Sequence, residues 1–451
     1  MIKEILVVPD PGRKKTQLQL QQQTYIDWVV ASLPQQEADY LLGNKDLDGL
    51  IFAATVQQLR GQELPEGHKM VYINEVLLMW HTIDVSPNNC LRACYMDFKT
   101  FTEIIHMRLD KLQLAMKKFA AVWGGLDLTK NYREAPVLFR LSNSSRDQGD
   151  STLCCTFERY MWALRRLEGV LPVWPGILEC RAASHDYNAI TLLDSIARDV
   201  TQSHRPTTEL ITSGTRLDPQ IPKPVVLKRE ASASRQFIKY PVKQKMLDEA
   251  KECGEYRLFM QPYVPEWDEV GQWRCLMVNQ ALFCIFIHPG SSRLTHHNSR
   301  VLDHSLREDG WSLKELGMLR KSNPDHCNFM IREGGTRAEI SRAQAEIQEF
   351  LVTTLAVFIR GEEVMLGRQG LENRLRPSSL RVSARVDLSV ITDPESKKLH
   401  YFVTGVSRGP GMMLYGSVDT NTIRRYALEF AHPFECWIGP RNPRPQTTSS
   451  I

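Results

Sequence analysis

The chain has 451 residues, and since about 150 residues is typical of one domain, its length predicts two or three packed units. Hydrophobic residues make up 42% of the chain and charged residues 24%, an ordinary balance that excludes a largely disordered protein. The formal net charge is only +4, with a pI near 8.4, which is too small an excess to indicate nucleic acid as the partner.

No apolar run approaches the roughly 18 residues that a bilayer-spanning helix requires, so we expect no membrane partner. The opening segment, 1–10, carries charges inside a short apolar run and lacks a small-residue cleavage site, so we expect no secretory signal. The 10 cysteines form no Cys-x-x-Cys pair, and their spacing suits neither a zinc site nor a disulfide framework. Together these features predict reduced, mostly buried thiols in a cytoplasmic protein.

The first 180 residues have the pattern of an α/β unit. Residues 5–8, 49–56 and 69–74 are short, mostly apolar runs that predict β-strands. Residues 98–123 carry apolar side chains at helical spacing, which predicts one long amphipathic helix. Strands that alternate with helices favour α/β architecture over an all-α or all-β fold.

The rest of the chain alternates apolar, β-rich runs with helical segments. Strands are predicted at 225–228, 257–260, 273–287, 386–391 and 400–404, and helices at 160–168, 186–200, 242–253 and 339–359. The end of the chain is rich in proline, arginine, serine and threonine, which predicts a flexible tail.

Two segments combine an apolar strand with charged or polar residues. The strand at 225–228 ends in Lys228 and leads into a small-residue loop, 231–234, whose backbone N–H groups can approach phosphate. Residues 259–274 combine an apolar strand, a charged turn and a second strand that begins with Trp273 and Arg274. The alternative interpretations are an edge strand with a solvated charged end and an ordinary β-hairpin.

A third segment pairs two strands after a helix. The helix at 339–359 is followed by a strand that carries Asp387 and by a second strand that carries Gly405 and Ser407.

In this order, the segments resemble the ATP-grasp superfamily, whose members hold ATP between two α+β subdomains. These enzymes usually join a carboxylate to an amine or thiol through an acyl-phosphate. The resemblance covers residues from about 160 to 416 and implies an α/β to α+β fold. It divides the chain into an N-terminal open-sheet domain (1–180), a central ATP-grasp-like subdomain (181–265), a C-terminal ATP-grasp-like subdomain (266–438) and a tail (439–451).

The resemblance implies roles for several residues in ATP binding. Lys228 would contact the nucleotide phosphates, and Arg274 would point into the cleft, so that both offset phosphate charge during catalysis. Adenine would lie near Gln261, Tyr263 and Val264, where backbone groups read its edge and apolar side chains enclose the ring. We expect Lys228 to face this segment across one cleft.

The same segment contains candidates for the ribose. Glu266 or Asp268, in the charged turn, would contact the ribose hydroxyls.

The resemblance also implies a Mg²⁺ site, from which this chain departs. Asp387 fits the first ligand position and faces the same cleft. Where the family has Glu-x-Asn, this chain has Gly405 and Ser407, and we expect Ser407 to be the second metal ligand. Tyr187 likewise stands where the family has a lysine that supports the phosphates.

Two functions therefore remain open. In the first, the protein is an ATP- and Mg²⁺-dependent ligase acting on a small-molecule carboxylate, and a neighbour such as Glu362, Glu363 or Glu372 replaces the missing glutamate. In the second, it is a degenerate relative that keeps the cleft as a binding or scaffold surface, with Arg408 pairing directly with phosphate.

Overall fold

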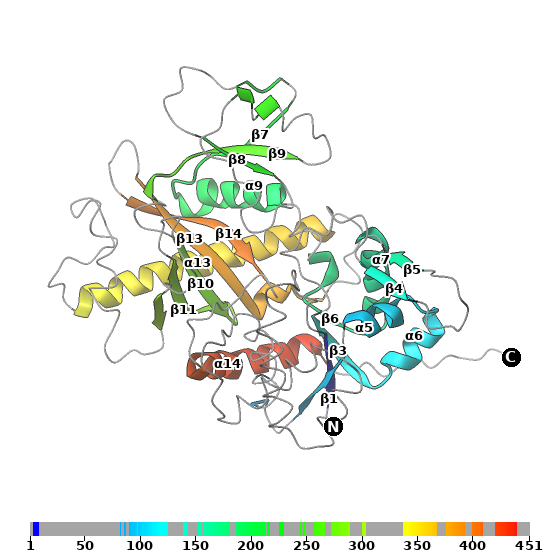
Figure 1. Ribbon diagram of the computed structural model, residues 1–451. Helices are drawn as coiled ribbons and strands as arrows, with labels where there is room; N and C mark the ends of the chain where they lie inside the picture. The colour runs from blue at the N-terminus through cyan, green and yellow to red at the C-terminus, as the bar shows by residue number, and fades with distance from the viewer. Residues whose placement is uncertain are drawn as a thin grey trace, which may run out of the picture.

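The structure is a computed structural model, shown in Figure 1. It describes residues 3–8, 82, 85–86, 90–96, 98–124, 139–142, 152–155, 157–179, 186–212, 214–216, 225–229, 244–245, 247–248, 257–266, 272–288, 300–303, 337–367, 376–392, 399–408 and 420–439. The predicted strands at 49–56 and 69–74 lie outside these residues. The described part is mixed α/β, as the sequence predicted.

The first of two large sheets is parallel. Its four strands, in the order β2-β1-β3-β6, are β1 (Lys3–Val8), β2 (Leu91–Tyr95), β3 (Phe119–Gly124) and β6 (Val173–Trp174). The apolar residues at 5–8 are completely buried, as is typical of a parallel strand that is covered on both faces. Gly124 ends β3 with φ +92°, and an added Cβ would lie 2.2 Å from the Val8 carbonyl oxygen. Only glycine fits this position without strain.

The predicted helix at 98–123 is wrong. The chain forms two short helices, α5 (Phe98–Ile105) and α6 (Leu109–Met116), and then enters strand β3. Arg108 separates the helices with an extended backbone, ψ 151°. The apolar run at 119–123 lies inside the sheet, because a short apolar run fits a buried strand as well as a helix and periodicity alone does not separate them.

Helices α5, α6 and α7 (Phe157–Glu168) enclose the core of this first unit. Helix α7 confirms the prediction at 160–168. The core includes Leu6, Phe101, Ile105, Leu112, Met116, Val122, Tyr160, Leu164 and Leu167. A two-stranded antiparallel pair, β4 (Phe139–Ser142) and β5 (Thr152–Cys155), belongs to the same region of the sequence.

The second large sheet is antiparallel and has five strands. Its strands, in the order β12-β11-β10-β13-β14, are β12 (Arg300–Asp303), β11 (Ala281–His288), β10 (Gln272–Val278), β13 (Ser383–Thr392) and β14 (Leu399–Ser407). Two helices pack on one face, α13 (Arg337–Leu366) and α9 (Asp186–Ile196), and they bury Leu193, Leu351 and Phe358 against Trp273, Cys275, Val386 and Leu388. A π-helical turn (Ala197–Thr201) follows α9.

A small third sheet lies beyond α9 (Figure 1). Its strands, in the order β7-β9-β8, are β7 (Glu209–Leu210), β9 (Leu258–Pro262) and β8 (Val225–Arg229). Leu227 and Met260 pack against Leu247, one of the few described residues of the helix predicted at 242–253.

Helix α14 (Thr420–Ile438), which the sequence reasoning missed, joins the two large sheets. Its Tyr426 packs on Phe283 of β11 and hydrogen-bonds to Ser383 of β13. At its other end, Phe434 lies 4.7 Å from Trp123 and 5.5 Å from Trp174, between ring centroids. The aromatic residues recur at helical spacing and could have predicted this helix.

Two positively charged side chains donate hydrogen bonds to the carboxyl end of α14. Arg376 donates to the carbonyl oxygens of Trp437 and Ile438, at 2.9 and 2.6 Å, and Lys3 donates to that of Gly439 at 3.2 Å. These contacts satisfy carbonyls that have no partner within the helix. None of the helices in the described part of the chain combines the length and apolarity that crossing a membrane requires.

Candidate functional site

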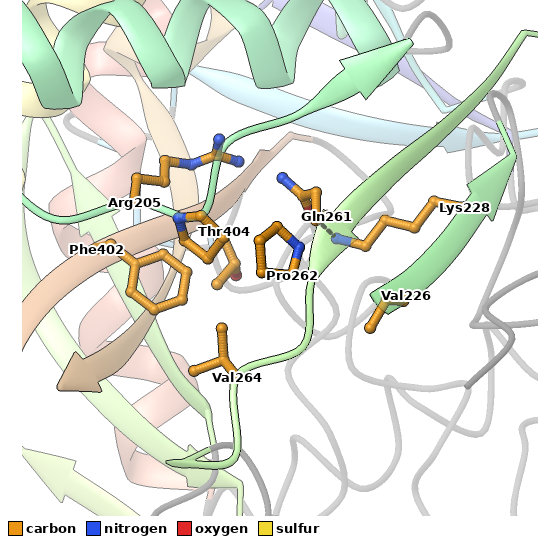
Figure 2. A pocket seen from close by; sticks show the side chains of 9 residues that line it. Arg205, Val226, Lys228, Gln261, Pro262, Val264, Phe402 and Thr404 are labelled. Atoms are coloured by element: carbon orange, nitrogen blue, oxygen red, sulfur yellow. Dashed lines mark hydrogen bonds between the residues drawn. The ribbon is translucent and has the colours of Figure 1, made fainter. Parts of the chain in front are cut away.

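A recess opens between the small sheet and strand β14. Figure 2 shows the side chains that line it: Arg205, Pro206, Val226, Lys228, Gln261, Pro262, Val264, Phe402 and Thr404. Three of the residues that the sequence assigned to ATP binding, Lys228, Gln261 and Val264, are thus brought together here. Strands β8 and β9 supply one wall, and β14 supplies the other.

Lys228 is held by a neutral partner. Its Nζ donates to Oε1 of Gln261, and Nε2 of Gln261 donates to Oγ1 of Thr208 at 2.7 Å (Figure 2 shows the first contact). Because both ends of the Gln261 amide are bonded and its side chain is buried, the orientation of the amide is fixed. An amide carries no charge, so the contact with Gln261 leaves the charge of the ammonium group intact.

The expectation that Lys228 faces the Gln261–Val264 segment across a cleft is wrong. Strands β8 and β9 pair antiparallel, with Val226 opposite Gln261 and Lys228 opposite Phe259, so Lys228 and Gln261 lie side by side on one wall. The facing wall consists of Phe402 and Thr404.

The centre of the recess is apolar. Val226, Val264 and Phe402 are each less than 5% exposed and come from both sheets. A small number of polar groups around an apolar centre is the usual composition of a ligand pocket.

The remaining residues assigned to the nucleotide lie outside this lining. Tyr263 and Glu266 are half-buried in the segment that follows β9, and neither is among the lining residues. Asp268 lies outside the described residues.

Arg205 lines the recess, and the sequence reasoning missed it. Its side chain is 4% exposed and forms an ion pair with Asp194 of α9, while its Nε donates to the carbonyl oxygen of Val403 at 2.9 Å. Burial lowers the pKa of Arg205 to about 10, so the guanidinium remains charged at neutral pH. Arg205 therefore fixes α9 to β14 at the edge of the recess.

A polar cluster on β13 and β14 adjoins the recess. Ala384, Val386 and Leu388 face the core under α13, so the alternating residues Arg385 and Asp387 lie on the other face of the sheet. Nε and Nη2 of Arg385 donate to the two carboxylate oxygens of Asp387 at 2.8 and 3.0 Å.

Strand β14 completes this cluster. Nη2 of Arg385 also donates to Oγ of Ser407 at 3.3 Å, and Gly405 pairs with Asp387 across the two strands. Thr404, which lines the recess, donates to the backbone oxygen of Asp387 at 3.1 Å. The cluster and the recess are therefore joined through Thr404.

The described residues of this cluster do not fit the Mg²⁺ site that the resemblance implies. Mg²⁺ takes six oxygen ligands, usually with one or two protein carboxylates, in near-octahedral geometry. Here both oxygens of Asp387 accept from a guanidinium, Ser407 accepts from the same group, and Gly405 offers no side chain. Within the described ranges, no group of three or more His, Cys, Asp or Glu residues is arranged to hold a metal ion.

Arg274 lies on the strand next to Asp387. Residues Arg274 and Asp387 pair across β10 and β13, and the neighbours of Arg274, Trp273 and Cys275, face the core under α13. Arg274 is therefore on the same face of the sheet as Asp387, although it does not line the recess.

Tyr187 packs as an aromatic residue where the resemblance has a lysine. Its ring lies 6.0 Å from that of Phe259, and the guanidinium carbon of Arg257 lies 5.3 Å from the Tyr187 ring centroid. This arrangement ties α9 to β9 by stacking and a cation–π contact.

Arg408 forms ion pairs in a buried network, so the expectation that it pairs directly with phosphate is wrong. It donates to Glu362 at 2.6 and 2.7 Å and to Glu179 at 2.9 Å, and all three side chains are at most 7% exposed. Glu362 is therefore not a substitute ligand for Mg²⁺. Glu363 pairs with Arg381 at 2.8 Å, and Glu372 lies outside the described residues.

No protein-family model matches the chain, and no curated protein matches it. Solved structures do resemble it. The D-cycloserine synthetase DcsG is 11% identical, with a TM-score of 0.45, and the match covers 80% of this chain and 94% of that one. A D-alanine--D-alanine ligase from Bacillus anthracis complexed with ATP is 11% identical, with a TM-score of 0.40 and coverages of 82% and 95%. The ATP-grasp ligase PsnB complexed with minimal precursor is 12% identical, with a TM-score of 0.41 and coverages of 95% and 100%.

The chain thus resembles ATP-grasp ligases in structure, which is the resemblance that its sequence predicted. At these identities the likeness concerns the fold, and with TM-scores this low it assigns no residue, ligand or activity.

Proposed function

We propose that this protein binds ATP in the recess between the β8–β9 wall and β14. The observation that supports the proposal is the meeting, in one recess, of Lys228, the Gln261–Val264 segment and apolar side chains from two different sheets. Of these residues, Lys228, Gln261 and Val264 are the ones that the resemblance assigns to ATP.

We propose a position in the recess for each end of the nucleotide. Val226, Val264 and Phe402 would enclose the adenine ring, and backbone groups after Gln261 would bind its edge. Lys228 would contact the phosphates, since an ammonium group is a compact charge on a flexible stem.

The reaction that we propose to test is ATP-dependent ligation. A carboxylate oxygen of the substrate would attack the γ-phosphorus, and ADP would leave. An amine or thiol would then attack the acyl carbon, lose its proton and release phosphate. Lys228 and Arg274 would contribute by positioning the phosphates and offsetting their charge.

A second candidate is nucleotide binding without turnover. Gly405 stands opposite Asp387, and Arg385 occupies both oxygens of that carboxylate, so a two-carboxylate metal site is lacking among the residues described. This observation favours a binding module over a ligase.

Calorimetric titration of ATP tests the binding proposal. Lys228→Ala is expected to weaken binding about tenfold, which corresponds to ~1.4 kcal/mol. Lys111→Ala, at an exposed position on α6, is the matched control and should bind like the wild type. Equal affinities for wild type and Lys228→Ala would reject the proposed site.

Release of ADP separates the two candidates. Wild-type protein is incubated with ATP and a panel of small carboxylates, with and without amines and thiols. Carboxylate-dependent ADP release supports the ligase, whereas ATP binding without release under every combination supports the binding module.

A further inference from the structure

The polar cluster of Arg385, Asp387 and Ser407 beside the recess contains a positively charged side chain. In it, the guanidinium of Arg385 balances the carboxylate of Asp387, and Ser407 adds a neutral hydroxyl. Arg274, opposite Asp387 on β10, adds a second guanidinium on the same face of the sheet. A cluster of two carboxylates would need a divalent cation to reach the same balance.

The pairing of Arg385 with Asp387 is built into the strand. The two residues are two positions apart on β13 and therefore lie on the same face of the sheet. The contact is bidentate, the side chains are only 11% and 13% exposed, and the bond to Ser407 extends it to β14. Bidentate pairs of this kind are stronger and more directional than single charge contacts.

The space around Gly405 does not require a residue without a side chain. A Cβ built at this position meets no atom within 4 Å, and its φ is outside the left-handed region. The strand therefore has room for a Cβ opposite Asp387, and the chain has no side chain there.

We infer that Arg385 takes the place of a protein-bound divalent cation at this site, so that ATP binding does not depend on Mg²⁺. The inference rests on the proposed function. A Mg²⁺ ion bound to Asp387 would have to displace the guanidinium or lie beside its positive charge, and like charges at that distance repel. Lys228 instead supplies positive charge in the β8–β9 wall of the recess. Arg385 supplies it in the cluster that Thr404 joins to the β14 wall.

Calorimetric titration of ATP into the wild-type protein, in EDTA and in excess Mg²⁺, is the first test. The expected dissociation constants agree within about threefold. An affinity that is about tenfold or more weaker in EDTA overturns the inference and leaves the proposed function intact. No binding in either buffer rejects the proposed function, and the inference is rejected with it.

Variants of the cluster provide the second test. Arg385→Gln leaves Asp387 without its guanidinium, so Mg²⁺ should now strengthen ATP binding, by about tenfold. A merely structural role for Arg385 would change the affinity equally in EDTA and in Mg²⁺, which would overturn the inference. Arg385→Lys keeps a positive charge beside Asp387, so ATP binding by this variant should be independent of Mg²⁺, as in the wild type.

Mn²⁺ reports on the site without nucleotide. By electron paramagnetic resonance, the wild type should not bind Mn²⁺ here, whereas the double variant Arg385→Gln, Gly405→Glu should bind it through Asp387 and the new carboxylate. Arg385→Gln, Gly214→Glu is the matched control, because Gly214 is exposed and lies in another part of the chain. Binding of Mn²⁺ by the wild type that is lost in Asp387→Asn would overturn the inference.

Discussion

Arg408 and Glu179 form a buried ion pair of 2.9 Å between positions that are 229 residues apart. Glu179 follows β6 of the parallel sheet, and Arg408 follows β14 of the antiparallel sheet, so the pair joins the two large sheets. The backbone N–H of Ser379 and its hydroxyl also donate to Glu179. Two carboxylates, Glu179 and Glu362, share one guanidinium, which leaves this network with an excess of negative charge.

The shared guanidinium predicts a pH-dependent stability. Burial, more than the nearby carboxylate of Glu362, raises the pKa of Glu179 from 4.5 to about 7. The folded state therefore binds this proton more tightly than the unfolded state. Its contribution to stability is fully present below pH 4.5 and is lost as the pH rises towards 7.

Glu179→Gln should remove that dependence, because glutamine does not titrate. The measurement is the free energy of unfolding in urea at several pH values between 4.5 and 7.5, where the wild type should lose stability with rising pH and the variant should lose less. Glu103→Gln, at an exposed position on α5, should behave like the wild type. Parallel curves for wild type and Glu179→Gln would contradict the prediction.

Arg408→Met should destabilise the protein strongly. It leaves two buried carboxylates without their cation, and breaking a buried pair by removing one partner costs about 3–5 kcal/mol. The matched control is Arg360→Met, which changes an exposed arginine on α13. Urea unfolding at neutral pH measures both, and a loss of under about 1 kcal/mol for Arg408→Met would contradict the prediction.

Replacing a glycine with alanine should destabilise the protein at Gly124 and leave its stability nearly unchanged at Gly405. At Gly124 the φ of +92° and the 2.2 Å approach to the Val8 carbonyl predict a loss of about 2–3 kcal/mol for Gly124→Ala. Gly405→Ala meets no atom within 4 Å and should change stability by less than about 0.5 kcal/mol. Thermal unfolding of the two variants provides the comparison, and equal melting temperatures would refute it.

The wall of the recess should depend on Thr208. Thr208→Val removes the acceptor of the Gln261 amide, and the loss of one hydrogen bond should weaken ATP binding by about threefold to tenfold. Thr207→Val changes the exposed neighbour and is the control. If the two variants bind ATP equally, the orientation of Gln261 does not matter for the ligand.

Local patterns in the sequence predicted much of the fold. The apolar runs at 5–8 and 225–228 are strands β1 and β8, and the amphipathic segment at 339–359 lies within α13. The prediction of one helix at 98–123 is wrong because the last residues of this segment are a buried strand, whose apolar run also fits helical spacing. The sequence therefore predicted the type of an element best where one periodicity was clearly present.

The site was predictable only in part. Lys228, Gln261 and Val264 do line one recess, because neighbouring strands bring them together. Arg205 and the pairing of Arg408 with Glu179 could not be inferred, since contacts between positions this far apart depend on how the sheets pack. Local spacing carries no information about such contacts.

Helix α14 also has a consequence for synthesis of the protein. Trp123 and Trp174 belong to the first sheet, yet the rings that cover them, including Phe434, come from the last described helix. On the ribosome, the first sheet is completed hundreds of residues before α14 emerges. Until then two tryptophans lack their cover, so the nascent chain has a lasting need for protection from aggregation at this surface.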